Sequence, residues 1–174
     1  MACVLAAQSR CSDTAPAIMR EWGLMKLLVP PPLVAAISAL LMWGIASQFD
    51  ALRFAFPLQE IVAYALIVSG ISIDIVSILA FRREKTTVTP LVPEKASSLV
   101  VTGLYRFTRN PMYLGLLLVL IGIALLLGSF VNVAVIVAFV AYITAFQIRP
   151  EEERLTEVFG ARYVAYTREV RRWI

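Results

Sequence analysis

The densest group of residues with chemical potential occupies positions 103–115, in the order Gly-Leu-Tyr-Arg-Phe-Thr-Arg-Asn-Pro-Met-Tyr-Leu-Gly. Asn110 is a favourable N-cap and Pro111 a favourable first residue for the apolar helix that follows. A helix start carries free backbone N–H groups and the positive end of the dipole, so an anion docks there readily. Arg109 adds a fork for a carboxylate or phosphate. The alternative is structural, with Asn-Pro starting a helix while Arg106 and Arg109 hold lipid headgroups.

A second charged cluster, Arg-Pro-Glu-Glu-Glu-Arg, occupies positions 149–154 and follows the last apolar stretch. Three adjacent glutamates beside a negative inner membrane surface are unfavourable unless a cation lies next to them. Arg106, Arg109 and a cationic ligand are the candidates for that cation. Because a tight turn at 128–130 joins the two apolar stretches between the clusters, we expect both clusters to meet at one cytosolic mouth.

Several other kinds of site are excluded by composition. The chain contains no histidine, which excludes histidine-based triads, zinc–histidine sites and histidine acid–base catalysis. Cys3 and Cys11 are the only cysteines and form no CxxC spacing, so we expect no metal site. The net charge of +4 is spread over loops and termini, as in membrane proteins, and predicts no nucleic-acid partner.

Four apolar stretches must position the two clusters. The chain is 60% hydrophobic and 16% charged, whereas a soluble domain has about 45–50% and about 25%. About 20 apolar residues cross the hydrocarbon core. The sequence therefore predicts an all-α integral membrane bundle of four transmembrane helices, the last two forming a C-terminal helical hairpin. The stretches are Leu27–Phe49, Leu58–Phe81, Tyr113–Leu127 and Val131–Ile148.

The distribution of basic residues predicts the topology. Fifteen of the sixteen Lys and Arg residues lie before the first apolar stretch, between the second and the third, or after the fourth. Only Arg53 lies in the loop between the first and the second stretch. Under the positive-inside rule both termini and the segment 82–111 face the cytoplasm. We expect a multi-pass protein of the plasma or inner membrane. Residues 1–26 are predicted as a mobile cytosolic leader and 27–174 as one domain.

The C-terminal segment is predicted to be an amphipathic cytosolic helix. Apolar residues recur in it every three or four positions and form one stripe. Two roles stay open, namely an interfacial helix anchored by Tyr and Trp, and a helix packed over the charged mouth. The stripe consists of Leu155, Phe159, Tyr163, Tyr166, Val170 and Trp173.

Asp74 lies well inside the second apolar stretch. A carboxylate there is costly and is usually paired or functional. Pairing with a basic residue near the cytosolic mouth is one interpretation. A role near the path of a lipophilic substrate is the other.

Three motifs, in their order and spacing, resemble the isoprenylcysteine carboxyl methyltransferase family, which is related to the membrane phospholipid methyltransferases. The resemblance covers residues 82–174. It implies an integral-membrane enzyme that binds S-adenosylmethionine at the cytosolic face without a Rossmann fold, and the sequence contains no GxGxxG. The motifs are Thr86-Thr87-Val88-Thr89-Pro90, Gly103-x-Tyr105-Arg106-x-x-Arg109-Asn110-Pro111-x-Tyr113-x-Gly115 and Glu151-Glu152-x-x-Leu155-x-x-x-Phe159-Gly160-x-x-Tyr163-x-x-Tyr166.

The resemblance also implies the site residues, among which Arg109 and Glu152 are predicted to be catalytic. The chemistry of the ligand fits, since its carboxylate suits the helix start and Arg109. A glutamate suits the ribose hydroxyls or the cationic part, and a tyrosine ring suits the sulfonium. The residues that line or shape the cofactor site are Gly103, Tyr105, Arg109, Asn110, Pro111, Tyr113, Gly115, Glu151 and Glu152.

The methyl acceptor is expected to be a lipophilic or lipidated molecule. Asn110 stands where many relatives have histidine, and an amide cannot take a proton. A carboxylate needs no base, whereas an ammonium must first lose a proton, which favours a carboxylate or thiolate acceptor unless Glu152 acts as the base. The alternatives are a phospholipid amine N-methyltransferase, a non-enzymatic membrane protein that binds lipid or a partner, and a membrane reductase.

Overall fold

A computed structural model describes residues 29–48, 52–83 and 99–174. The predicted leader 1–26 and the motif at 86–90 lie outside these residues. The described part is helical, and a single antiparallel bridge between Arg53 and Ser129 is its only extended pairing. The all-helical prediction is therefore confirmed.

The described helices follow the predicted apolar stretches closely. Their bounds are α3 Pro31–Gln48, α4 Gln59–Arg83, the 3-10 helix η3 Gly103–Arg106, α5 Pro111–Leu127, α6 Asn132–Ile143, the π-helix η4 Thr144–Ile148, α7 Arg149–Phe159 and α8 Ala161–Glu169.

Among the described residues, three helices are long and apolar enough to cross a membrane. They are Pro31–Gln48, Gln59–Ala80 within α4, and the continuous 28-residue run Asn132–Phe159. α5 is apolar as well but shorter, with 17 residues. The outward faces of α3 and α4 carry large exposed apolar side chains, among them Leu40 and Val68 at 67% and 63% exposure. Such surfaces suit contact with lipid rather than water.

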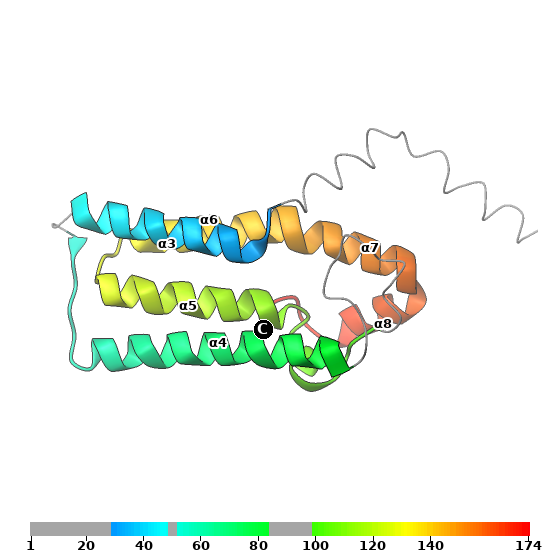
Figure 1. Cartoon of the computed structure of the whole chain (residues 1–174). Helices are drawn as coiled ribbons and strands as arrows, with labels where there is room; N and C mark the ends of the chain where they lie inside the picture. Colours follow the sequence, from blue (N-terminus) through cyan, green and yellow to red (C-terminus); the bar gives the residue numbers. More distant parts are fainter. Residues whose placement is uncertain (1–28, 49–51, 84–98) are drawn as a thin grey trace, which may run out of the picture.

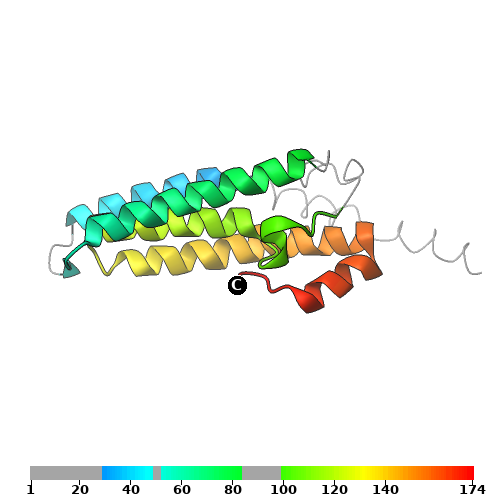
Figure 2. The ribbon, with the colours of Figure 1, turned by 90° about the horizontal axis from the view of Figure 1, so that it is seen from below.

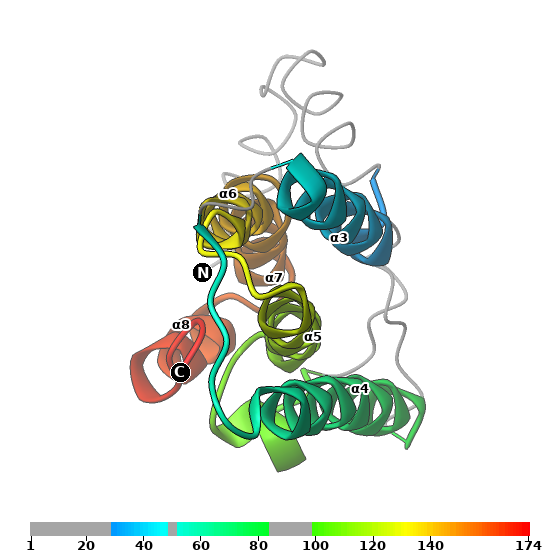
Figure 3. The ribbon, with the colours of Figure 1, turned by 90° about the vertical axis from the view of Figure 1, so that its left-hand side faces the viewer.

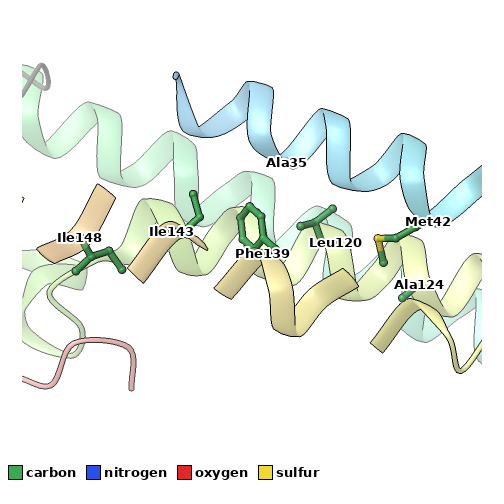
Figure 4. Packing of buried hydrophobic residues seen from close by; sticks show 7 residues of the cluster. All are labelled: Ala35, Met42, Leu120, Ala124, Phe139, Ile143 and Ile148. Atoms are coloured by element: carbon green, nitrogen blue, oxygen red, sulfur yellow. The ribbon is translucent and has the colours of Figure 1, made fainter. Parts of the chain in front are cut away.

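α5 lies at the centre of the bundle. Viewed end-on, it is flanked by α4 on one side and by α3 and α6 on the other (Figure 3). Buried side chains from α3, α5 and the α6–η4 run fill the core (Figure 4). This core consists of Ala35, Met42, Leu120, Ala124, Phe139, Ile143 and Ile148.

Glycines bring the backbones of α4 and α5 into contact. A Cβ atom at Gly70 would lie 2.5 Å from the carbonyl oxygen of Gly115, and one at Gly122 would lie 2.7 Å from that of Ala63. Small residues at such crossings are typical of helix packing in membranes.

A tight turn connects α5 to α6. Gly128 ends α5 with a φ of 58°, a left-handed conformation that favours glycine. Its carbonyl oxygen accepts a hydrogen bond of 2.8 Å from the backbone N–H of Phe54. This turn and the α3–α4 connection therefore lie together at one end of the bundle, opposite α8 (Figure 1).

The C-terminal region differs from the single amphipathic helix that was predicted. Gly160 adopts φ 53° and ψ −130°, which ends α7 and starts α8 in a new direction. α8 consequently runs back beside α7 (Figure 2). The periodic stripe could not reveal this break, because Gly160 lies between two of its apolar members. The fourth apolar helix also continues through η4 into α7 rather than ending at Ile148.

Candidate functional site

The two charged clusters meet at the end of the bundle where α8 lies. The η3 turn leads into the start of α5, while α7 continues the α6 helix past that point (Figures 1 and 2). A guanidinium nitrogen of Arg109 lies 3.1 Å from Glu152 Oε1, and both side chains are largely buried, at 13% and 16% exposure. The meeting expected from the sequence is thus observed at atomic contact.

A second arginine holds the same carboxylate. Arg172 donates from Nε to Glu152 Oε1 at 3.0 Å and from Nη2 to Glu152 Oε2 at 2.7 Å. This is the bidentate arrangement that guanidinium and carboxylate groups prefer. The hydrogen bonds that Arg172 donates to Glu152 raise the pKa of its guanidinium, so it stays charged. Sequence analysis did not select Arg172, because no periodicity or motif links it to Glu152.

The segment after α8, residues 170–174, forms what we call the C-terminal strap. The strap receives hydrogen bonds from the turn before α5. The backbone N–H of Arg109 donates to the carbonyl of Arg171 at 3.0 Å, and Asn110 Nδ2 donates to the carbonyl of Arg172 at 2.9 Å. Asn110 occupies the N-cap position of α5, but its side chain makes no cap hydrogen bond. The predicted N-cap position is therefore confirmed, but the observed contact of the side chain is the bond from its N–H to the strap and not a cap hydrogen bond.

Glu151 points to a different part of the site from its neighbour Glu152. The hydroxyl of Tyr113 donates to Glu151 Oε2 at 3.0 Å, which connects the first turn of α5 to the first turn of α7. The two adjacent glutamates therefore make different contacts: Glu151 bonds to α5, whereas Glu152 pairs with Arg109 and Arg172.

Two tyrosines of α8 pack under the site. Tyr166 is 9% exposed and donates to the carbonyl of Tyr105 at 2.6 Å. Tyr163 is 3% exposed and lies close enough to Arg109 and Glu152 to feel their charges. Burial, and next the negative charge of Glu152, raise the pKa of Tyr163 to about 12. Such burial excludes the role of these two tyrosines as interfacial anchors.

A cleft of about 480 Å³ opens between α7, α8 and the strap. Its lining combines three guanidiniums, two carboxylates, two threonine hydroxyls and one aromatic ring. The lining residues are Arg109, Arg149, Glu152, Glu153, Thr156, Tyr163, Thr167 and Arg172.

More than half of the chain matches a known protein family. The model of the family described as phospholipid methyltransferase matches residues 58–162. The chain belongs to this family. The resemblance drawn from the motifs is thereby confirmed.

This member of the phospholipid methyltransferase family is similar to two proteins from other organisms. An uncharacterised protein of Haemophilus influenzae is 41% identical over 63 residues, which are 36% of this chain and the whole of that protein. The protein-S-isoprenylcysteine O-methyltransferase of Saccharomyces cerevisiae is 36% identical over 72 residues, which are 41% of this chain and 30% of the yeast protein. No solved structure matches the chain significantly.

Some predicted residues of this family member lie away from the cleft. Gly103 starts η3 with a φ of 62° and is exposed, so its conformation explains why glycine stands there. Gly115 is buried against α4, and a Cβ atom there would collide with the carboxylate of Asp74. Pro111 is buried at the start of α5. These three shape the backbone around the site and do not line the cleft.

Asp74 has no basic partner in the part of the chain that the structure describes. Its Oδ1 atom is buried and has no hydrogen-bond partner within residues 29–48, 52–83 and 99–174. The carboxylate lies beside Gly115 and acts electrostatically on Tyr105. Pairing of Asp74 with a basic side chain near the mouth is therefore not observed among the described residues.

Proposed function

We propose that this protein is an S-adenosylmethionine-dependent methyltransferase that acts on a lipophilic acceptor at the cytosolic face of a membrane. The observation that carries the proposal is the contact between Arg109 and Glu152. These residues come from the two motifs that the family resemblance supplied, and they meet beside a cleft at the end of an apolar helical bundle.

The residues at the cleft suit the proposed cofactor. S-adenosylmethionine is zwitterionic at its amino-acid end, and the cleft presents guanidinium and carboxylate groups side by side. Arg109 Nε is buried and has no hydrogen-bond partner among the described residues. In this proposal Arg109 and Glu152 hold the cofactor, which when bound supplies an electrophilic methyl group.

The protein's contribution to the reaction is mainly alignment. Both oxygens of Glu152 already accept hydrogen bonds from guanidiniums, so this carboxylate is fixed in position. The hydrogen bond between Tyr113 and Glu151 holds the starts of α5 and α7 together. On the α8 side of the site, the buried rings of Tyr163 and Tyr166 exclude water. Fixed geometry in a water-poor site is an established source of acceleration for a transfer between two bound groups.

The acceptor enters this proposal as an amphiphile that reaches the cleft from the bilayer. A carboxylate of a prenylcysteine-like molecule needs no proton removal, which suits a chain without histidine. A phospholipid amine is the alternative acceptor. In the same proposal α3, α4, α5 and the α6–α7 helix are four transmembrane helices, with both termini cytoplasmic and the cleft at the positively charged end.

Calorimetric titration of the purified protein with S-adenosylmethionine tests the proposal. We expect binding to the wild type and a loss of about tenfold or more in affinity for both Arg109→Ala and Glu152→Ala, because each removes a charge-assisted contact. Arg106→Ala is the matched control, since Arg106 is exposed on η3, and its affinity should equal that of the wild type.

Incubation with methyl-labelled S-adenosylmethionine and native lipid extract then identifies the acceptor through the labelled product. Absence of binding to monodisperse wild-type protein would overturn the proposal. A thermal stability that responds to lipid headgroups but not to S-adenosylmethionine would favour a non-enzymatic lipid-binding protein instead.

A further inference from the structure

The C-terminal strap fixes one side chain of the cleft. Its backbone is held at two successive carbonyls, of Arg171 by the N–H of Arg109 and of Arg172 by the amide of Asn110. Thr108 Oγ1 donates to the Arg172 carbonyl as well, at 3.3 Å. Trp173 packs against the main hydrophobic core. The backbone that carries Arg172 is thus anchored on both sides of that residue.

The ion-pair cluster around Glu152 carries more positive than negative charge. Arg109 and Arg172 bring two positive charges to the single carboxylate of Glu152, so the three groups together carry a net charge of +1. The Arg172 side chain is 36% exposed and lines the cleft, whereas Arg109 and Glu152 are mostly buried. An anionic group that enters the cleft therefore meets Arg172 as an accessible guanidinium held in a fixed orientation.

We propose that Arg172 is a further cofactor-binding residue, and that with Glu152 it forms the subsite for the amino-acid end of S-adenosylmethionine. This inference rests on the proposed function. The guanidinium of Arg172 is complementary to the ligand's carboxylate, and the carboxylate of Glu152 is complementary to its ammonium. The strap thereby couples the last five residues of the chain to ligand recognition.

Two ligands that differ at the amino-acid end separate this role from a structural one. S-adenosylhomocysteine retains the amino-acid end, and 5′-methylthioadenosine lacks it. By calorimetry on the full chain, we expect Arg172→Ala to weaken S-adenosylhomocysteine binding about tenfold or more and to leave 5′-methylthioadenosine binding within about twofold. Arg172→Gln, which keeps N–H donors but no charge, should show the same selective loss.

Arg171→Ala is the matched control. Arg171 is the preceding strap residue, its side chain is exposed, and only its backbone carbonyl holds the η3–α5 turn. Both ligands should bind this variant as they bind the wild type.

The outcomes distinguish the two proposals. If the wild type binds neither ligand, the proposed function and this inference both fall. If it binds S-adenosylhomocysteine while both Arg172 variants weaken the two ligands equally, or weaken neither, the cofactor site stands and only the role of Arg172 is overturned. Should Arg172→Ala fail to fold, Arg172→Gln alone decides between these outcomes.

Discussion

The hydroxyl of Tyr166 connects α8 to the η3 turn through its hydrogen bond to the carbonyl of Tyr105. Burial, and next the neighbouring Tyr163, raise the pKa of Tyr166 to about 12, above its ordinary value of 10.0. A phenol whose pKa is higher in the folded than in the unfolded chain stabilises the fold fully below about pH 10. That contribution is lost as the pH rises from about 10 towards about 12.

Tyr166→Phe should therefore destabilise the protein in a pH-dependent manner. Loss of the buried donor leaves the Tyr105 carbonyl without this partner and should cost about 1–3 kcal/mol at pH 8. The difference from the wild type should shrink above pH 10, where the wild type itself loses the contribution. Thermal unfolding in detergent micelles between pH 8 and pH 11 measures both effects.

Tyr64→Phe serves as the control for that series, because Tyr64 is 57% exposed on the outer face of α4. It should match the wild type at every pH. A gap between Tyr166→Phe and wild type that stays constant up to pH 11 would contradict the assignment of the alkaline loss to Tyr166.

The contact between Arg109 and Glu152 could be predicted from the sequence, whereas the contacts of Arg172 and Asn110 could not. Arg109 and Glu152 were predictable because charged residues beside apolar helix ends demand partners. Arg172 was not, because its contact with Glu152 depends on α8 turning back at Gly160 and on the strap being non-helical. The amide of Asn110 likewise bonds to a carbonyl 62 residues further along the chain, which no local capping rule anticipates.

The crossing of α4 and α5 depends on the absence of side chains at defined positions. A Cβ atom at Gly122 would lie 2.6 Å from Ile67 Cγ1 and 2.7 Å from the carbonyl oxygen of Ala63. Gly44 in α3 has nothing within 4 Å of the corresponding position. The same substitution is therefore expected to act in opposite directions in the two helices.

Gly122→Ala should destabilise the bundle by about 1–3 kcal/mol, because the added methyl group forces α4 and α5 apart. Gly44→Ala should be neutral or stabilising by up to about 1 kcal/mol, since alanine favours the helix and meets no neighbour. Titration with a denaturing detergent in micelles measures both free energies of unfolding. Equal effects of the two substitutions would show that close approach at Gly122 is not required.

The elements themselves were largely predictable from runs of apolar residues. Such runs specify helices wherever backbone polar groups cannot reach water, so α3, α4 and α5 fall within a few residues of expectation. The stripe from Leu155 to Val170 also predicted which side chains gather, and these now share one buried cluster. It could not predict the turn at Gly160, because the cluster forms equally well from two helices packed side by side.

At the scale of the whole molecule, the charged residues that line the cleft lie at one end of the described bundle. The cleft, α7, α8 and the strap lie at the end of the bundle opposite the α5–α6 turn (Figure 1). Arg53 is in the opposite connection, where its guanidinium donates to the carbonyl of Ala46 at 3.1 Å. In the proposed topology, the positive-inside rule puts the cleft on the cytoplasmic side of the membrane.

Single cysteines introduced into a variant without Cys3 and Cys11 test this topology. Phe130→Cys in the α5–α6 turn should react with a membrane-impermeant maleimide in intact spheroplasts, because Phe130 is 60% exposed at the predicted outer face. Glu157 is an exposed residue of α7, and Glu157→Cys should react only after permeabilisation. Labelling of both positions from the same side would contradict the proposed orientation.

The sequence by itself determined the helical bundle, the apolar outer surface and the two charged clusters, because helix formation and the segregation of charge are local consequences of side-chain polarity. The tertiary structure alone decided which groups complete the site. The bidentate contact of Arg172 with Glu152 and the contact of the strap with the η3–α5 turn depend on the change of chain direction at Gly160, and Asp74 Oδ1 meets no hydrogen-bond partner among the described residues. These contacts join segments far apart in the chain, so the residues near each partner do not reveal them.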